Sequence, residues 1–191
     1  MRQSIEAVNC IKKIKDWKRS RLALLTLGQI HVNDGKYNEA IATYLSISDW
    51  EKDLEVRLSI SFAYMEGGLY KKAIENLNGF NVQDVRCVSV IAECHRRQMM
   101  FNEAEQVITL FPSWEKYKNL WISKIITEEI KAIHNKNFID LTEAENYLRN
   151  NHPAWENDRD FLLTLARAYE YGRSAEQSRY YFNKLIQLYP S

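Results

Sequence analysis

Apolar residues recur along the chain at helical spacing, in pairs of segments separated by short polar turns. Three stretches read alike: LALLTLGQIHVNDGKYNEAIATYLSI, VRLSISFAYMEGGLYKKAIENLNGF and VSVIAECHRRQMMFNEAEQVITLF. Each contains a small residue, an aromatic or imidazole side chain three positions later, a second aromatic six positions after that, and then an alanine three positions on. Self-similarity of this kind is typical of stacked helical hairpins. The pattern therefore predicts an all-α chain built from antiparallel helix pairs.

The small residues have a steric explanation, because two antiparallel helices approach closely only where small side chains face each other. The predicted close pairs are Gly28/Ala40, Ser61/Ala73 and Ala92/Ala104. The first two turns contain a glycine, which commonly ends a helix in the left-handed conformation. The third turn, RQMMF, lacks glycine and is predicted to be tighter or strained.

Residues at these offsets resemble the tetratricopeptide repeat family, whose pattern has small residues at its eighth and twentieth positions and aromatics at its eleventh, seventeenth and twenty-fourth. The first segment matches at Leu27, Gly28, Tyr37, Ala40 and Tyr44. The last matches at Leu165, Ala166, Tyr169, Phe182 and Pro190, with Ser178 where alanine is usual. The resemblance covers roughly residues 21 to 190 and implies a right-handed α-solenoid of about five hairpins with an extra N-terminal helix. An irregular helical bundle or another kind of helical solenoid is the alternative fold.

The fourth hairpin departs from this pattern, because 40 residues separate Ala104 from Ala144 where the family repeat has about 34. We expect an overlong first helix here and a second helix that begins near Asp140. The register of this hairpin stays open.

Residues 4–19 are predicted to form a separate amphipathic helix with basic residues around its apolar stripe. That stripe contains Ile5, Val8, Ile11, Ile14 and Trp17. We expect it to cap the first hairpin, since terminal units of a solenoid need a cap; a basic membrane-surface helix or a contact for an acidic partner is the alternative. The expected organisation is a capping helix over residues 1–20 and a solenoid over residues 21–191, as a single domain or a piece of a longer chain.

Composition supports this interpretation. Only 6 Gly and 3 Pro occur among 191 residues, too few for a turn-rich β fold, and the net charge of +1 provides no overall field for nucleic acid or membrane. The three cysteines, Cys10, Cys87 and Cys94, are predicted to be free thiols. The sequence has no secretory signal and no apolar run long enough to span a bilayer, so we expect a cytoplasmic location if Met1 is the true start.

No catalytic motif is recognisable, so we expect a non-enzymatic protein without cofactor or metal. His31 and His95 occupy the aromatic position of the repeat and are predicted to be packed. Cys87 and Cys94 are two helical turns apart, too far to share one ion directly. The aromatic content of 12% raises single-stranded nucleic acid as an alternative ligand, which the absence of a basic track disfavours.

The family resemblance implies a partner-binding groove lined by the first helix of each hairpin. The predicted groove residues are Leu25, Gln29, Leu58, Phe62, Met65, Arg86, Ser89, Glu93, Arg96 and Arg97, with Asp160, Leu163, Arg167, Glu170 and Tyr171 in the last hairpin. The apolar members are predicted either to form a groove floor or to fill space between helices. The arginines would form a cationic end that suits an apolar segment with acidic character. The clamp by which some family members bind a chaperone carboxylate is absent, because Leu25, Gln29 and Val90 occupy its positions.

We therefore expect an adaptor or chaperone that binds a peptide or helix of a partner protein. The alternative is a structural subunit packed end to end in a multiprotein assembly or secretion complex, or in a homo-oligomer. Its predicted docking ends are Trp17, Tyr181, Leu185 and Leu188. Nucleic acid and membranes are not expected as partners.

Overall fold

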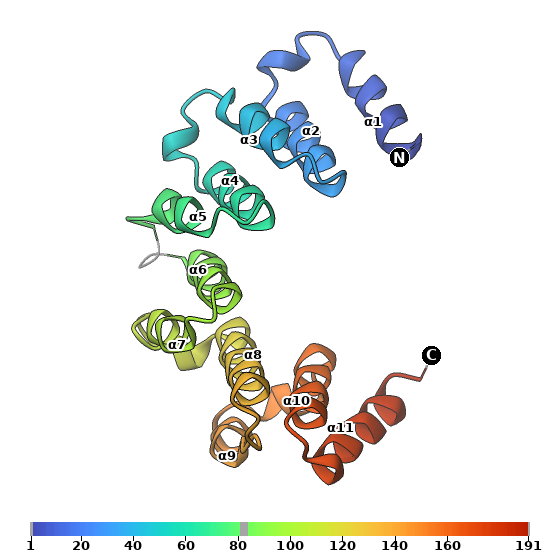
Figure 1. The fold of residues 1–191 in the computed structure, drawn as a ribbon. Helices are drawn as coiled ribbons and strands as arrows, with labels where there is room; N and C mark the ends of the chain where they lie inside the picture. The colour runs from blue at the N-terminus through green and yellow to red at the C-terminus, as the bar shows by residue number, and fades with distance from the viewer. Residues whose placement is uncertain (1, 81–83, 191) are drawn as a thin grey trace. The chain divides into compact units, whose positions relative to one another are not determined.

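The computed structural model describes residues 2–80 and 84–190, and all regular structure within those ranges is helical. The α-helices are α1 (Arg2–Lys12), α2 (Arg21–Asn33), α3 (Tyr37–Leu45), α4 (Leu54–Glu66), α5 (Tyr70–Leu77), α6 (Val85–Arg97), α7 (Phe101–Thr109), α8 (Lys118–Asn135), α9 (Thr142–Asn151), α10 (Arg159–Tyr171) and α11 (Ala175–Leu188) (Figure 1). The short 3-10 turns are η1 (Trp17–Arg19), η2 (Trp50–Lys52), η3 (Trp114–Lys116) and η4 (Pro153–Asn157). The predicted all-α fold of consecutive hairpins is confirmed. The predicted domain limits at residues 1 and 191 lie outside the described residues.

Contacts divide the chain into two compact units, residues 1–94 and 95–191, and the division falls within α6. In the first unit α2 pairs with α3, α4 pairs with α5, and α3 also contacts α4. In the second unit α7 packs on α8, α8 on α10, and α10 on α11. Each unit is therefore stabilised by contacts between helices that are close in the chain, as expected of a solenoid.

The first hairpin closes around Tyr44, which is buried in the core of the first unit. A Cβ atom at Gly28 would lie 2.2 Å from the Tyr44 ring, so only glycine fits beneath this tyrosine. The predicted small residue at this position is therefore required, and the large side chain that it accommodates is Tyr44.

Two other hairpins place a serine at the same close approach. Ser61 Oγ donates to the backbone carbonyl of Ala73 at 3.0 Å, and Ser178 Oγ donates to the carbonyl of Ala166 at 3.0 Å. Ser61 lies on the first helix of its hairpin and Ser178 on the second, and each hydroxyl donates to the backbone of the facing helix. Serine can thus replace the usual alanine at position 178 without leaving an unpaired buried donor.

Short linkers with a tryptophan precede α2, α4, α8 and α10. The indole-bearing residue lies in a 3-10 turn, four residues before the first residue of the helix, at Trp17, Trp50, Trp114 and Trp155. In the first three linkers the preceding residue is left-handed, with φ of 55°, 54° and 54° at Asp16, Asp49 and Ser113. All four indoles pack against the core of their own unit. A comparison of the hairpins alone does not reveal this repeated element, because it lies between them.

Helix α1 is shorter than the predicted helix over residues 4–19. The helix ends at Lys12, because the chain turns into the first tryptophan linker, so Trp17 lies on η1 and not on α1. Ile11 is buried against Ala23 and Leu27 of α2. Ile14, beyond the helix end, is 51% exposed. The continuous apolar stripe predicted for this segment is therefore wrong in its last third.

The turns inside four hairpins share one backbone geometry. A left-handed residue occurs at Gly35, Gly68, Met99 and Arg173, with φ of 73°, 76°, 60° and 62°. The N–H of the next residue then donates to the carbonyl five residues earlier, at 2.8 to 3.0 Å, as in a Schellman motif. Met99 adopts this conformation without being glycine, which confirms the strain predicted for the third turn.

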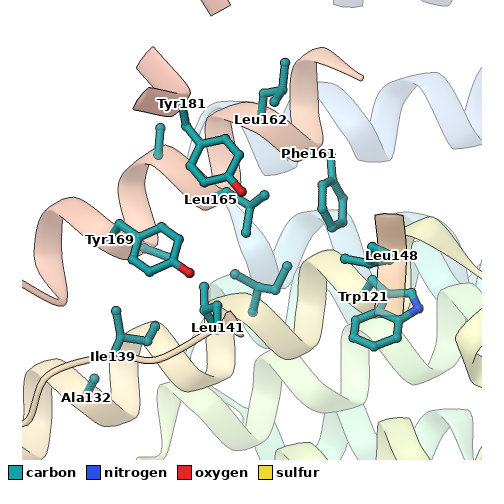
Figure 2. Close-up of a cluster of buried hydrophobic side chains, with 13 residues drawn as sticks. Trp121, Ala132, Ile139, Leu141, Leu148, Phe161, Leu162, Leu165, Tyr169 and Tyr181 are labelled. Atoms are coloured by element: carbon teal, nitrogen blue, oxygen red, sulfur yellow. The ribbon is translucent and has the colours of Figure 1, made fainter. Parts of the chain in front are cut away.

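The core of the second unit joins four helices. Figure 2 shows Trp121 of α8 and Leu148 of α9 near Phe161 of α10, with Tyr169 and Tyr181 toward the opposite side of the cluster. The rings of Tyr169 and Tyr181 are nearly parallel, at 6.0 Å between centroids and 3° between planes. This core holds α8 and α10 together and so positions the surface between them.

Candidate functional site

The predicted groove residues of the first unit lie on α2 and α4 with different degrees of exposure. Gln29 is exposed and donates to Asn33 at 3.0 Å, and Phe62 is 39% exposed. Leu25 and Leu58 are half-buried. Met65 is only 4% exposed and belongs to a cluster with buried residues of α5 and α6. The prediction that Met65 lines a groove is therefore corrected: this side chain fills space between helices.

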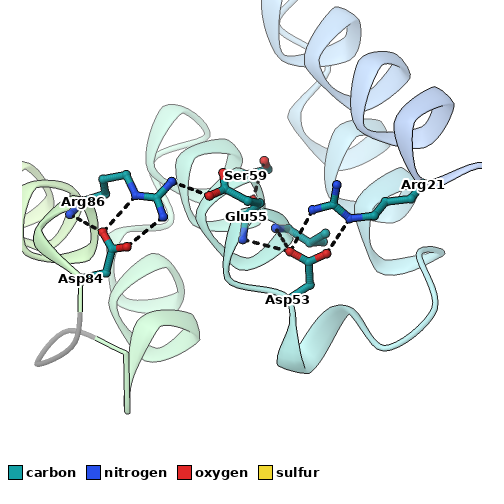
Figure 3. A network of polar contacts seen from close by, with 7 residues as sticks. Arg21, Asp53, Glu55, Ser59, Asp84 and Arg86 are labelled. Atoms are coloured by element: carbon teal, nitrogen blue, oxygen red, sulfur yellow. Dashed lines mark hydrogen bonds and ion pairs between the residues drawn. The ribbon is translucent and has the colours of Figure 1, made fainter.

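Arg86 belongs to a chain of charges along the starts of α2, α4 and α6 (Figure 3). It donates to Asp84, with 2.8 Å between Nη2 and Oδ2, and also pairs with Glu55. Arg21 Nε donates to Asp53 Oδ2 at 2.6 Å. These hydrogen bonds lower the pKa of both aspartate carboxyls. The predicted cationic residue Arg86 is therefore neutralised by carboxylates of its own unit.

Arg96 also differs from its predicted role as a cationic groove residue. It is only 5% exposed, and Nη1 donates to Ser123 Oγ at 2.8 Å, to the Ser123 carbonyl at 3.1 Å and to Thr127 Oγ1 at 3.1 Å. This buried guanidinium is bound by α8 within the second unit. The other predicted residues of α6 are Ser89 and Glu93, which are half-buried, and Arg97, which is exposed.

The second unit has a cleft of about 490 Å³ between the first helices of its two hairpins. Its lining includes Ile126 and Glu129 of α8 and Asp160, Leu163, Arg167 and Tyr171 of α10. The four residues of α10 are predicted groove residues. Ile126 of α8 stands eight residues after the first residue of its helix, as Arg167 does in α10. Glu129 stands eleven residues after it, the position of the predicted groove residue Glu170.

Ile126 and Glu129 are not among the predicted groove residues, because the sequence pattern leaves the register of the fourth hairpin open. Trp114 supplies the signal that would have found them, since it stands four residues before α8 as the other linker tryptophans stand before their helices. Burial raises the pKa of Glu129, and the charge of Arg167 opposes this effect. The cleft thus contains a partly desolvated carboxyl beside apolar side chains.

The predicted docking ends are less exposed than expected. Trp17 is half-buried in the core of the first unit, and Tyr181 is only 7% exposed. Leu185 is half-buried against the core of the second unit, and Leu188 is 44% exposed. Trp17 and Tyr181 are therefore core residues. The apolar side chains that α11 does expose include Ile186, at 68%.

The remaining candidate chemistry is that of histidines and cysteines. Among the described residues no cluster of His, Cys, Asp and Glu could hold a metal ion. Cys87 and Cys94 are buried and Cys10 is exposed. Burial lowers the pKa of His95, whose Nδ1 is buried. None of the described helices combines the length and apolarity required to cross a bilayer.

Comparison with known proteins identifies one segment. Residues 160–191 match the family model of the tetratricopeptide repeat. The matched segment covers most of α10 and all of α11, and so contributes one wall of the 490 Å³ cleft. No curated protein matches the chain. The match confirms the resemblance to this family that the hairpin pattern predicts.

Proposed function

We propose that the protein is a non-enzymatic adaptor or chaperone that binds a segment of a partner protein between α8 and α10. The last hairpin matches the model of the tetratricopeptide repeat, a module of protein–protein interaction. One observation carries the proposal: the first helices of both hairpins line a single cleft, with Ile126 and Arg167 at the same position of their helices. An extended groove between such helices suits a peptide or a helix.

The chemistry of the cleft favours a segment with an apolar side chain next to a basic one. Ile126 and Leu163 offer apolar surface, and Glu129 and Asp160 contribute carboxylates. A basic group from the partner would stabilise the charged form of the partly buried Glu129, as the charge of Arg167 already does. The acidic segment expected from the sequence has less support, because Arg86 and Arg96 are occupied within the chain.

A matched pair of tyrosines tests the proposal. Tyr171 lies in the cleft and is 57% exposed, whereas Tyr180 lies on α11 and is 55% exposed. Peptides selected from a displayed library on the full chain should lose affinity for Tyr171→Ala and retain it for Tyr180→Ala. Equal binding to the wild type and to Tyr171→Ala would refute the cleft as the binding site.

The second candidate function is that of an assembly subunit. Tyr180, Ile186 and Leu188 expose apolar surface along α11, and large exposed apolar patches mark interaction sites. Light scattering of the full chain should then show an oligomer that Ile186→Asp dissociates. A monomer at all accessible concentrations would rule out self-association through this helix.

A further inference from the structure

The first helix of the fourth hairpin carries isoleucine where the other first helices carry a small residue. The position lies seven residues after the first residue of the helix, and its occupants elsewhere are Gly28, Ser61, Ala92 and Ala166. In α8 the occupant is Ile125, which is 1% exposed. A branched side chain at the point of closest approach keeps the second helix at a distance.

The second helix of this hairpin shows the effect. The corresponding alanines Ala40, Ala73 and Ala104 have no exposed surface, whereas Ala144 of α9 is half-buried and lines a cleft. The connection from α8 to α9 is also longer, spanning residues 136–141, where the first two hairpins use residues 34–36 and 67–69. The fourth hairpin is therefore open where the others are closed.

The opening forms a second cleft, of about 410 Å³, with an aromatic wall. The rings of Trp114 and Trp121 lie 4.7 Å apart, and Tyr147 stacks on Trp121 at 5.2 Å. Trp121 is fixed in place, because its Nε1–H donates to the carbonyl of Glu115 at 2.9 Å. This wall belongs to α8, α9 and η3, and none of its side chains lines the cleft between α8 and α10.

Charge in this cleft is predominantly negative. The described residues that line it include the carboxylates of Glu115, Glu128 and Asp140 and the ammonium group of Lys124. The backbone N–H of Thr142 donates to Asp140 at 2.9 Å, and this hydrogen bond lowers the pKa of the Asp140 carboxyl, which keeps it ionised.

The resident lysine shows what the aromatic wall accepts. Lys124 Nζ lies 5.5 Å from the centre of the Trp114 ring and 3.6 Å from Glu105. A cation over an indole face is attracted by the ring quadrupole. The wall therefore already holds one cation. Glu128 also lies 3.8 Å from Lys131 Nζ, and Asp140 adds a further carboxylate for a second cation.

We propose that this opened hairpin is a binding site for an arginine side chain of a partner protein. A guanidinium combines a planar face that packs on aromatic rings with a fork of donors that suits carboxylates, whereas an ammonium offers only a point charge. Ala144 and Tyr147, which also line the cleft and are only partly buried, suit the methylene stem. The site is separate from the cleft between α8 and α10, so this proposal is tested independently of the proposed function.

The test uses the two indole N–H signals of the cleft in the nitrogen-15 spectrum of the full chain. Titration with N-acetyl-arginine amide should shift the Trp114 and Trp121 signals saturably, in the millimolar range expected of a single side chain. N-acetyl-citrulline amide has nearly the same shape without the charge and should not shift them. Saturable shifts with citrulline equal to those with arginine would overturn the proposal.

A double variant tests the carboxylates. Asp140→Asn with Glu128→Gln removes both charges, while the asparagine oxygen can still accept the Thr142 N–H, so the start of α9 is retained. We expect about tenfold weaker binding of the arginine amide. Glu176→Gln, an exposed carboxylate on α11, is the matched control and should bind as the wild type does. Unchanged affinity in a double variant with the wild-type circular dichroism spectrum would also overturn the proposal.

Discussion

The glycines of the hairpin turns allow one backbone effect to be measured without steric interference. Gly35 and Gly68 have φ of 73° and 76°, and no atom lies within 4 Å of a Cβ built on either residue. In Gly68→Ala the left-handed conformation costs about 1–2 kcal/mol. Alanine also reduces the conformational entropy of the unfolded chain, which adds about 0.4–1 kcal/mol to the free energy of unfolding. We expect a net loss of about 1 kcal/mol, or about 2–4 °C in Tm for a chain of this size.

The third turn provides the opposite experiment. Met99 has φ of 60° and is 57% exposed, so its side chain contributes little burial. Met99→Gly should stabilise the protein by about 1 kcal/mol, and Met99→Ala separates loss of the side chain from relief of the backbone. The assay is urea or thermal unfolding followed by far-ultraviolet circular dichroism. A Gly68→Ala variant as stable as the wild type, or a Met99→Gly variant less stable than Met99→Ala, would refute the reasoning.

Three further predictions concern buried polar groups. Arg96→Met should lower the free energy of unfolding by roughly 1–3 kcal/mol, because it leaves the hydroxyls on α8 without their donor, whereas the exposed Arg97→Met should cost less. Ellman's reagent should modify Cys10 in the native protein and leave Cys87 and Cys94 unmodified, since both are buried and burial raises the pKa of the Cys87 thiol to about 11. Acidification should destabilise the protein in part through His95, whose folded-state pKa is lowered by burial. As pH falls through 6.5, the ordinary histidine value, the unfolded state therefore binds more protons than the folded state, and the free energy of unfolding decreases. His95→Tyr should lose less stability than the wild type between neutral and acidic pH.

Each of these predictions has a contrary outcome. Equal losses for Arg96→Met and Arg97→Met would mean that the hydrogen bonds to α8 contribute little. Rapid modification of all three thiols in folded protein would contradict the burial of Cys87 and Cys94. Parallel pH profiles of unfolding free energy for the wild type and His95→Tyr would show that His95 does not titrate differently in the two states.

Local patterns were predictable from the sequence, and contacts across hairpins were not. Gly28 and Ser61 predict close helix packing, because the distance of approach depends on the size of the side chain at that position. The position of Arg96 in its helix predicts an exposed cation. In the structure the side chain is buried and donates to Ser123 and Thr127, which lie on α8 in the next hairpin. No periodicity within α6 could reveal that partnership.

The register of the fourth hairpin could not be predicted for a different reason. Its register depends on a small residue that Ile125 replaces, so the marker used for the other hairpins is absent. The linker before it keeps the spacing of the other linkers, because the 3-10 turn and the start of the helix are set locally. Two independent local signals are therefore needed to align an irregular repeat.

The tryptophans of the linkers also allow the unfolding of each unit to be followed by intrinsic fluorescence. Trp17 and Trp50 belong to the first unit, and Trp114, Trp121 and Trp155 belong to the second. Each linker indole packs on the core of its own unit, so local melting changes the emission of that set alone. With phenylalanine at positions 17 and 50, the remaining fluorescence would follow residues 95–191 only. The order in which the two halves lose structure could then be followed without an added label.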